Sequence, residues 1–462
     1  MITLATVPTI LFNNYTIDRP IYEYDTINPI EFNKSYNTLS DDYAYIDEVE
    51  YIFDNGIKYF SRRHYFTGNS DKYTSSFNIK GDDNTIKIRY LSNERWIETS
   101  NYEKTFPVTM LYIETNKENM VISPAMLQKH SLYGCVEFLR DMEEPISITK
   151  NDDGYSINVE FNCISDSFGD IWAIKSKYDL IDWNDYTENY YKVNDLSDKQ
   201  RWTYDGYFME CPTSYMPNGE NIYFKNPANY VGKSFSSYYF DDYTYNIGFT
   251  MMDTALKNIN SDGYFESNYR SSWLYEDFGL SENYYDTRFN TDLFTGYIRA
   301  YKRYEYDEFL EAAKNYGDFL VDYFNEHNYK YKDGILVEDY MHKNGNKKTD
   351  ASLNHNLANV NFLFYLYDET LEKKYYDSAL KVLKGVENTV DDWIMEDNNL
   401  EYAINYSTGY HKLVDYPYLT YNDLFETRSI LINHDLDYSY IQKLMDSKKK
   451  WMDANGITEY TK

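Results

Sequence analysis

A tyrosine-rich segment is the part of the chain whose residue types are best suited to chemistry. Residues 401–421, EYAINYSTGYHKLVDYPYLTY, contain six tyrosines, a histidine and an aspartate. Tyrosine combines a flat apolar face with a hydroxyl group, which suits contact with sugars, and a phenol can also move protons. A phenol with a pKa near 10 is a poor base in water, but a neighbouring Arg or Lys lowers that pKa. Because the chain holds 55 tyrosines, a structural role is the alternative for each of them.

Histidine, tryptophan and acidic residues provide further candidates. His355 lies on the border between the apolar and polar faces of a predicted helix, where a structural histidine is the default and a catalytic one the alternative. His411 and His342 lie in predicted loops and could bind substrate or shuttle protons. Trp273 is either a platform for a sugar ring or a core residue. A carboxylate pair for glycoside cleavage could come from Asp286, Asp292, Glu276 and Asp277.

Charge and composition exclude several classes of protein. The 462 residues carry a net charge of −30, which argues against nucleic acid as a partner and mildly against polyanionic substrates. No apolar run approaches the roughly 18 residues of a membrane span. The first residues lack a basic leader and a clear cleavage site, so we expect no signal peptide, and the location, cytoplasmic or cell-envelope, is left open. Three widely spaced cysteines form no zinc pattern, and no phosphate-binding, HExxH, G-x-S-x-G or EF-hand motif occurs, so we predict no metal and no cofactor.

The first half of the chain shows the pattern of β-strands. Residues 1–50 are polar and are predicted to be irregular. From residue 51 to 234 apolar residues alternate with polar ones, as in SSFNIKGDDNTIKIRYL (residues 75–91) and VTMLYIETNKENMVIS (residues 108–123), which both resemble strand–turn–strand hairpins. We therefore predict an N-terminal antiparallel β domain that forms a sandwich or a barrel.

The second half, residues 235–462, shows the three- and four-residue spacing of helices. Apolar stripes occur in residues 287–304, 306–327, 350–370 and 373–394, and shorter helices are predicted at about 424–433 and 438–451. Short links join most neighbours, so we predict antiparallel α/α hairpins that form an incomplete toroid. Three links are long, residues 260–284, 326–351 and 397–420, and long links in a compact helical domain often carry function.

Four motifs in this half resemble the C-terminal domain of the glucuronyl C5-epimerases over about residues 250–455. YYDTRFNTDLFTGYIRAYKRY is similar to an aromatic–Tyr segment that runs into a helix ending in Arg-Ala-Tyr. LVEDYMHKNGNKKTDASLNHNLANVNFLFYLYDET is similar to an acidic–acidic–Tyr loop followed by a helix. EYAIN resembles a Tyr-x-x-Arg element, and DYPYLTYNDL resembles an Asp-Tyr-His-x-x-x-x-Asn-x-Leu element.

The resemblance implies catalytic roles for Tyr340, Tyr402 and Tyr416, with Asp339 beside the first of them. At Asn405 the chain departs from the family, whose arginine there would hold the substrate carboxylate. Arg288 and Lys412 are the cations of this chain that could take its place, and Trp273, His355 and His411 complete the predicted substrate-binding set.

We therefore predict a carbohydrate-active enzyme that epimerises C5 of uronic acid residues in a polysaccharide or glycan, without a nicotinamide cofactor. Two acid/base groups must flank the sugar, and the carboxylate must be neutralised. A glycoside hydrolase or polysaccharide lyase on the same kind of scaffold is the first alternative, because fold does not determine chemistry. A non-catalytic glycan-binding protein is the second. A homodimer is left open.

Overall fold

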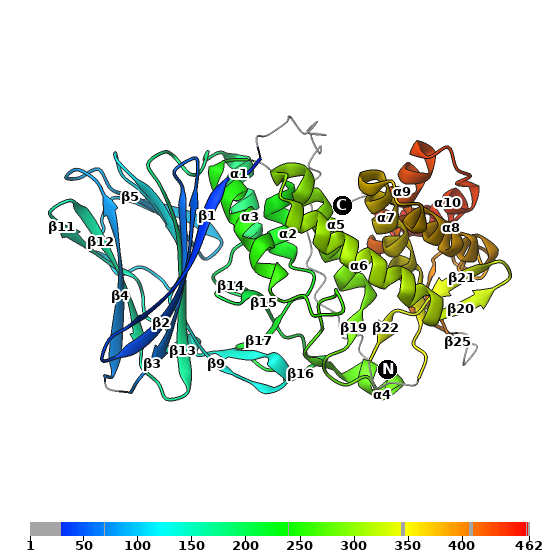
Figure 1. Cartoon of the computed structure of the whole chain (residues 1–462), viewed down its shortest axis with the longest axis horizontal. Coiled ribbons are helices and arrows are strands. Elements are labelled where there is room, and N and C mark those ends of the chain that lie inside the picture. Colours follow the sequence, from blue (N-terminus) through cyan, green and yellow to red (C-terminus); the bar gives the residue numbers. More distant parts are fainter. Residues whose placement is uncertain are drawn as a thin grey trace. The chain divides into compact units, whose positions relative to one another are not determined.

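The computed structural model describes residues 29–68, 70–238, 240–342, 347–405, 410–458 and 460, and for residues 405 and 410–414 it describes the backbone alone. These residues form two compact units (Figure 1). Unit 1 comprises residues 29–257 and 303–306, and unit 2 comprises residues 258–302 and 307–460. A large antiparallel β region and ten α-helices within the described residues confirm the predicted α+β, multidomain fold class.

Unit 1 is built mainly from antiparallel strands. One sheet of thirteen strands runs in the order β14-β15-β17-β10-β9-β13-β8-β7-β5-β6, with β1, β2 and β3 attached through β13, and a second sheet has the order β11-β12-β4. The strands are β1 (Phe32–Ser40), β2 (Ala44–Phe53), β3 (Lys58–Phe66), β4 (Lys72–Lys80), β5 (Lys87–Ser92), β6 (Arg95–Thr99), β7 (Leu111–Glu114), β8 (Asn119–Ile122), β9 (Met126–His130), β10 (Val136–Phe138), β11 (Ser147–Asn151), β12 (Gly154–Asn162), β13 (Ser167–Ser176), β14 (Gln200–Thr203), β15 (Gly206–Glu210), β16 (Tyr215–Met216) and β17 (Ile222–Lys225).

The two sheets share one hydrophobic core. Ile79 on β4 and Ile157 on β12 belong to the same buried cluster as Ile88 on β5, Leu111 on β7 and Ile171 on β13. Side chains of a strand point alternately to its two faces, so each sheet turns one apolar face toward the other. The arrangement is a sandwich, one of the two architectures that the sequence predicts.

Only one of the two predicted hairpins forms. β7 and β8 pair as expected, with Leu111 opposite Ile122. The hairpin predicted in residues 75–91 is wrong, because β4 pairs with β12, while β5 pairs with β6 and β7. The two strands lie in different sheets and face each other across the core. Alternation identifies a strand, but the packing of the sheets selects its partner.

The prediction that residues 1–50 are irregular is wrong for residues 32–50. β1 pairs along its whole length with β2, which begins at Ala44. β1 lacks apolar alternation because seven of its nine side chains are exposed and none is buried. A strand with so little burial leaves no hydrophobic pattern in the sequence.

Three helices belong to unit 1: α1 (Asp185–Val193), α2 (Tyr230–Ser237) and α3 (Asp242–Leu256). Asp241 caps the start of α3, and its carboxylate accepts the backbone N–H of Thr244 in a capping box. The hydroxyl of Tyr51 on β2 donates a hydrogen bond to Asp253 at 2.6 Å, and Lys34 on β1 forms an ion pair with the same carboxylate. These contacts attach α3 to the face of β1 and β2.

Unit 2 contains the helical hairpins and short strands. Its elements are β18 (Arg270–Ser271), α4 (Ser272–Phe278), β19 (Tyr285–Asp286), α5 (Thr287–Tyr304), α6 (Asp307–Glu326), β20 (Asn328–Tyr331), β21 (Gly334–Val337), β22 (Tyr340–Met341), β23 (Ala351–Ser352), α7 (Leu353–Thr370), α8 (Lys373–Asn388), β24 (Glu401–Asn405), β25 (Tyr410–Val414), α9 (Leu419–Asn433) and α10 (Ser439–Ala454). Links of two to five residues join α5 to α6, α7 to α8 and α9 to α10, as predicted for hairpins. The three long links are less irregular than expected, because they contain short strand pairs. In the described ranges, no helix has both the length and the apolar composition needed to span a membrane.

The close contact between α8 and β21 leads to a stability prediction. A β-carbon on Gly385 would lie 2.0 Å from the carbonyl oxygen of Ile335, so backbone meets backbone without an intervening side chain. Gly385→Ala is expected to lower the free energy of unfolding by about 1–3 kcal/mol, as overpacking does. Urea denaturation measures this change. Lys381→Ala, on the exposed face of the same helix, is the control and should leave the midpoint almost unchanged. Equal midpoints for the two variants would contradict the prediction.

Candidate active site

Short strand pairs bring the three long links of unit 2 together. β19 directly follows the first link and pairs with β22 in the second, so that Asp286 lies opposite Tyr340. β23 ends the second link and pairs with β24 in the third, with Ser352 opposite Ala403. Residues far apart in the sequence therefore meet at one place, which includes the start of α5 and of α7.

Aromatic rings surround Tyr340. This tyrosine is buried, and its ring centroid lies 5.8 Å from Trp273, 6.1 Å from Tyr284 and 5.6 Å from His355, each in an edge-to-face arrangement. Trp273 is half-buried on α4, in the first long link. The predicted site residues Trp273, Tyr340 and His355 are therefore neighbours.

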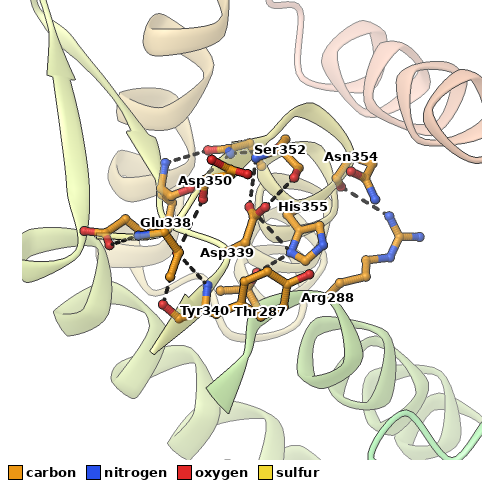
Figure 2. Close-up of polar contacts among 12 residues, drawn as sticks. Thr287, Arg288, Glu338, Asp339, Tyr340, Asp350, Ser352, Asn354 and His355 are labelled. Carbon is orange, nitrogen blue, oxygen red and sulfur yellow. Dashed lines mark hydrogen bonds and ion pairs between the residues drawn. The ribbon is translucent and has the colours of Figure 1, made fainter. Parts of the chain in front are cut away.

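Asp339 and His355 form a buried polar network (Figure 2). Ser352 donates its backbone N–H to Oδ1 of Asp339 at 2.8 Å and its hydroxyl to Oδ2. Nδ1 of His355 lies 2.7 Å from the hydroxyl oxygen of Thr287 and 3.6 Å from Asp339 Oδ1. Burial, aided by Arg288, lowers the pKa of His355 to about 3, and burial raises the pKa of Asp339 well above its usual range. The imidazole is therefore neutral at physiological pH.

The other two predicted tyrosines lie against each other. The rings of Tyr402 and Tyr416 meet edge to face at 5.6 Å, and both residues are half-buried. Burial is the main reason that the pKa values of Tyr340, Tyr402 and Tyr416 are raised; Tyr402 adds to the effect at Tyr340, Tyr416 adds to it at Tyr402, and Asp415 adds to it at Tyr416. All three phenols are therefore protonated at neutral pH, the form that can donate a hydrogen bond or a proton.

Carboxylates of the protein already engage Arg288. Its Nη1 and Nη2 donate to Asp423 at 2.6 and 3.2 Å, and its Nε donates to Asp292 at 3.3 Å. Nη1 also donates to the carbonyl oxygen of Asn354 at 3.2 Å (Figure 2). The charge of Arg288 favours a lower pKa at Tyr416, against the larger effect of burial. Arg288 therefore shares its charge with Asp423 and Asp292. Its role in holding a substrate carboxylate stays a prediction.

Asp286 is a buried carboxyl group that lies directly opposite Tyr340 in the β19–β22 pair. Its charge contributes, after burial, to the raised pKa values of Tyr340, Tyr402 and Tyr416. Burial raises the pKa of Asp286 to about 7, although the backbone N–H of Phe289 donates to the carboxylate at 3.0 Å and favours a lower value. In the sequence, Asp286 is one of four acidic candidates. It directly precedes a predicted helix, a position where aspartate is common as a cap. Its burial among tyrosines is visible in the tertiary structure alone.

The remaining predicted site residues are half-buried or exposed, or have side chains outside the described residues. Asp292 is half-buried and forms an ion pair with Arg288. Asp277 and His342 are half-buried, and Glu276 is exposed. The side chains of Asn405, His411 and Lys412 lie outside the described residues. Within the described part of the chain, no group of three or more His, Cys, Asp and Glu side chains is arranged to hold a metal ion.

The raised pKa of Asp286 predicts a pH-dependent stability difference. The folded protein retains a proton up to pH 7 that the unfolded chain releases near pH 3.8, so this group stabilises the fold below pH 4 and the contribution is lost as the pH rises to 7. Asp286→Asn keeps a cap acceptor and does not titrate. Its free energy of unfolding, relative to the wild type, should rise by up to about 1.4 kcal/mol per pH unit between pH 4 and 7. Denaturant titrations at four pH values measure this difference, and a constant difference would contradict it.

Comparison with known proteins finds only distant structural similarity. No family model matches the chain, and no curated protein matches its sequence. An unsaturated glucuronyl hydrolase from Bacillus sp. GL1 is 12% identical, with a TM-score of 0.34 over 48% of this chain and 59% of that one. A family 76 mannosidase from Bacteroides thetaiotaomicron is 14% identical, with a TM-score of 0.35 over 49% and 59%. A D-mannose isomerase is 12% identical, with a TM-score of 0.38 over 51% and 63%. The chain thus spans less than two thirds of each of these three proteins, and at these values the matches assign neither fold family nor activity.

Proposed function

We propose that unit 2 carries the active site of a carbohydrate-active enzyme that epimerises C5 of uronic acid residues. The observations that support this proposal are strand pairs that bring the long links together, with Asp286 opposite Tyr340 and Ser352 opposite Ala403, and the ring contact between Tyr402 and Tyr416. We also propose that the helical hairpins form an incomplete α/α toroid, whose long links would then lie at one end.

The protonation states divide the roles within this proposal. Epimerisation breaks the C5–H bond, leaves the electron pair on the substrate as an enolate-like carboxylate, and returns a proton to the opposite face. Asp286, with a pKa of about 7, suits removal of the proton, because a general base works best when its pKa is near the operating pH. The protonated phenols suit its return, and half-buried Tyr416 is the phenol at which the charge of Arg288 favours a lower pKa.

Hydrolysis of an uncharged glycan is the second candidate, and the environment of Arg288 favours it. Asp423 and Asp292 share that guanidinium, so little net positive charge is left for a substrate carboxylate. Burial raises the pKa of Asp286 to about 7. A buried carboxyl group that is protonated near neutral pH is the type of acid that donates a proton to a glycosidic oxygen.

One experiment separates these candidates. The protein is incubated in heavy water with uronate-containing polymers and, separately, with neutral glycans such as mannan. Epimerisation gives deuterium at C5 by NMR without new chain ends, a lyase gives unsaturated ends, and a hydrolase gives new reducing ends. Deuterium at C5 supports the first proposal, and reducing ends without exchange overturn it in favour of the second. Absence of every product, with binding retained, would leave a glycan-binding protein and overturn both.

A further inference from the structure

Unit 1 carries a second cluster of tyrosines, on the strands β1, β2 and β3. Tyr45 on β2 lies directly opposite Tyr65 on β3. Tyr36 on β1 lies opposite Val49, which is four residues from Tyr45 along β2 and so faces the same side of the sheet. Tyr36 and Tyr45 are each 57% exposed and Tyr65 is 40% exposed. Three large rings on neighbouring strands are thus open to solvent on one face.

A buried arginine supports a fourth ring on this face. Arg63 is directed by two hydrogen bonds to Asp170, at 2.8 and 2.7 Å, and by one to Asp205 at 2.5 Å. Its guanidinium carbon lies 4.4 Å from the ring centroid of Phe168 and 5.4 Å from that of Tyr204, in the turn between β14 and β15. Because Asp170 is fully buried, the arginine is held in one position below the exposed tyrosines.

A lysine lies between two of these rings. The ammonium of Lys257, an exposed residue at the end of α3, lies 4.7 Å from the ring centroid of Tyr36 and 5.8 Å from that of Tyr204. Within the ranges that the structure covers, no carboxylate lies at ion-pair distance from Lys257. Burial acts to raise the pKa of Tyr36, but hydrogen bonds to Lys34 and Lys257 outweigh it and the pKa is lowered. The phenol therefore lies in a locally positive environment within a chain of net charge −30.

We propose that Tyr36, Tyr45, Tyr65, Tyr204 and Lys257 form a carbohydrate-binding surface on unit 1 that takes a sugar residue carrying a carboxylate. The rings offer flat faces for the C–H face of a sugar, and the phenols offer hydrogen bonds to its hydroxyl groups. The ammonium of Lys257 supplies the charge that complements a carboxylate. Of the acidic groups near these rings, Asp47 accepts a hydrogen bond from Thr38 at 3.1 Å and Asp205 pairs with Arg63, so we expect the attraction on the side of Lys257. The choice of a uronate as ligand rests on the proposed function.

Binding to the intact protein tests this surface independently of catalysis. The probes are a glucuronate-containing oligosaccharide and the same oligosaccharide after reduction of its carboxyl groups to alcohols. We expect the wild type to bind the acidic form more tightly, and Lys257→Met to bind both forms equally. Tyr204→Ala and Tyr36→Ala should weaken binding of both forms about ten-fold, the size of one lost stacking contact. Calorimetric titrations measure the affinities, and the unfolding midpoint shows whether each variant is folded.

Matched controls lie elsewhere on the same unit. Lys177→Met and Tyr178→Ala change an exposed lysine and a 68% exposed tyrosine, and should leave both affinities unchanged. Wild-type affinities in folded Lys257→Met and Tyr36→Ala would overturn the surface, even if C5 exchange is found. Loss of binding in these variants together with an absence of C5 exchange would instead support the surface and overturn the epimerase proposal.

Discussion

Tyr416→Phe is expected to slow deuterium incorporation at C5 by about 10²–10⁴-fold, the contribution of one positioned acid/base group. The variant keeps the ring, and with it the edge-to-face contact with Tyr402 at 5.6 Å, and loses the hydroxyl alone. Tyr416 is half-buried, whereas Tyr340 is buried, so its phenol is the better placed of the two to meet a substrate. The measurement is the initial rate of deuterium incorporation, by NMR, for folded wild type and variant at equal concentration.

The control for this experiment is Tyr438→Phe, which removes a phenol that is 40% exposed at the start of α10. It should exchange at the wild-type rate. If Tyr416→Phe also keeps the full rate, Tyr416 has no part in the proton transfer. If Tyr416→Phe retains exchange and Asp286→Asn loses it, the buried carboxyl group alone carries the acid/base chemistry. The proposed division of roles between phenol and carboxylate is then wrong.

Lys448→Met is expected to lower the free energy of unfolding by about 3–5 kcal/mol, the usual result of removing one partner of a buried ion pair. Lys448 on α10 is fully buried, and its ammonium lies 2.8 Å from Asp415 and donates to Asn399 at 2.6 Å. Asp415 in turn accepts a hydrogen bond from Thr420 at 2.5 Å. Without the lysine, the carboxylate stays buried with an uncompensated charge. Denaturant unfolding followed by circular dichroism measures the change.

The neighbouring residue on α10 provides the matched control. Lys449 pairs with Asp453 on the solvent-exposed side of the helix, so Lys449→Met should have little effect. Adding Asp415→Asn to Lys448→Met removes the unpaired charge and should restore part of the lost stability. Because Asp415 precedes Tyr416, Lys448→Met should also impair C5 exchange at temperatures where it remains folded. Equal effects of the two lysine variants would show that the buried pair does not anchor this segment.

The helices of unit 2 could be predicted from the sequence because their apolar stripes are local. The predicted segment 287–304 coincides with α5, and residues 306–327 contain α6 at 307–326. Helix α7 differs in that it buries polar as well as apolar side chains. Its apolar positions are buried as expected, but Asn354, Asn356 and Asn359 are buried as well. Polar side chains that are buried do not follow an apolar period.

The strands of unit 1 could be located more easily than they could be paired. Alternation in residues 75–91 identified β4 and β5 but suggested a hairpin, whereas the two strands belong to different sheets. β1, exposed along most of its length, left no apolar pattern. A strand's side-chain period is a local property, but its partner depends on which sheets pack together, and that information is distributed over the whole chain.

For the candidate site, the sequence by itself determined which residue types lie on the long links, and its resemblance singled out Tyr340, Tyr402 and Tyr416. Tertiary structure decided the rest. The pairing of β19 with β22 brings Asp286 opposite Tyr340, and burial there raises the pKa of its carboxyl group to about 7. The ion pair of Arg288 with Asp423 joins residues 135 positions apart. Burial and long-range charge arise from groups that are distant along the chain, so a sequence pattern that spans one helix or one loop does not contain them.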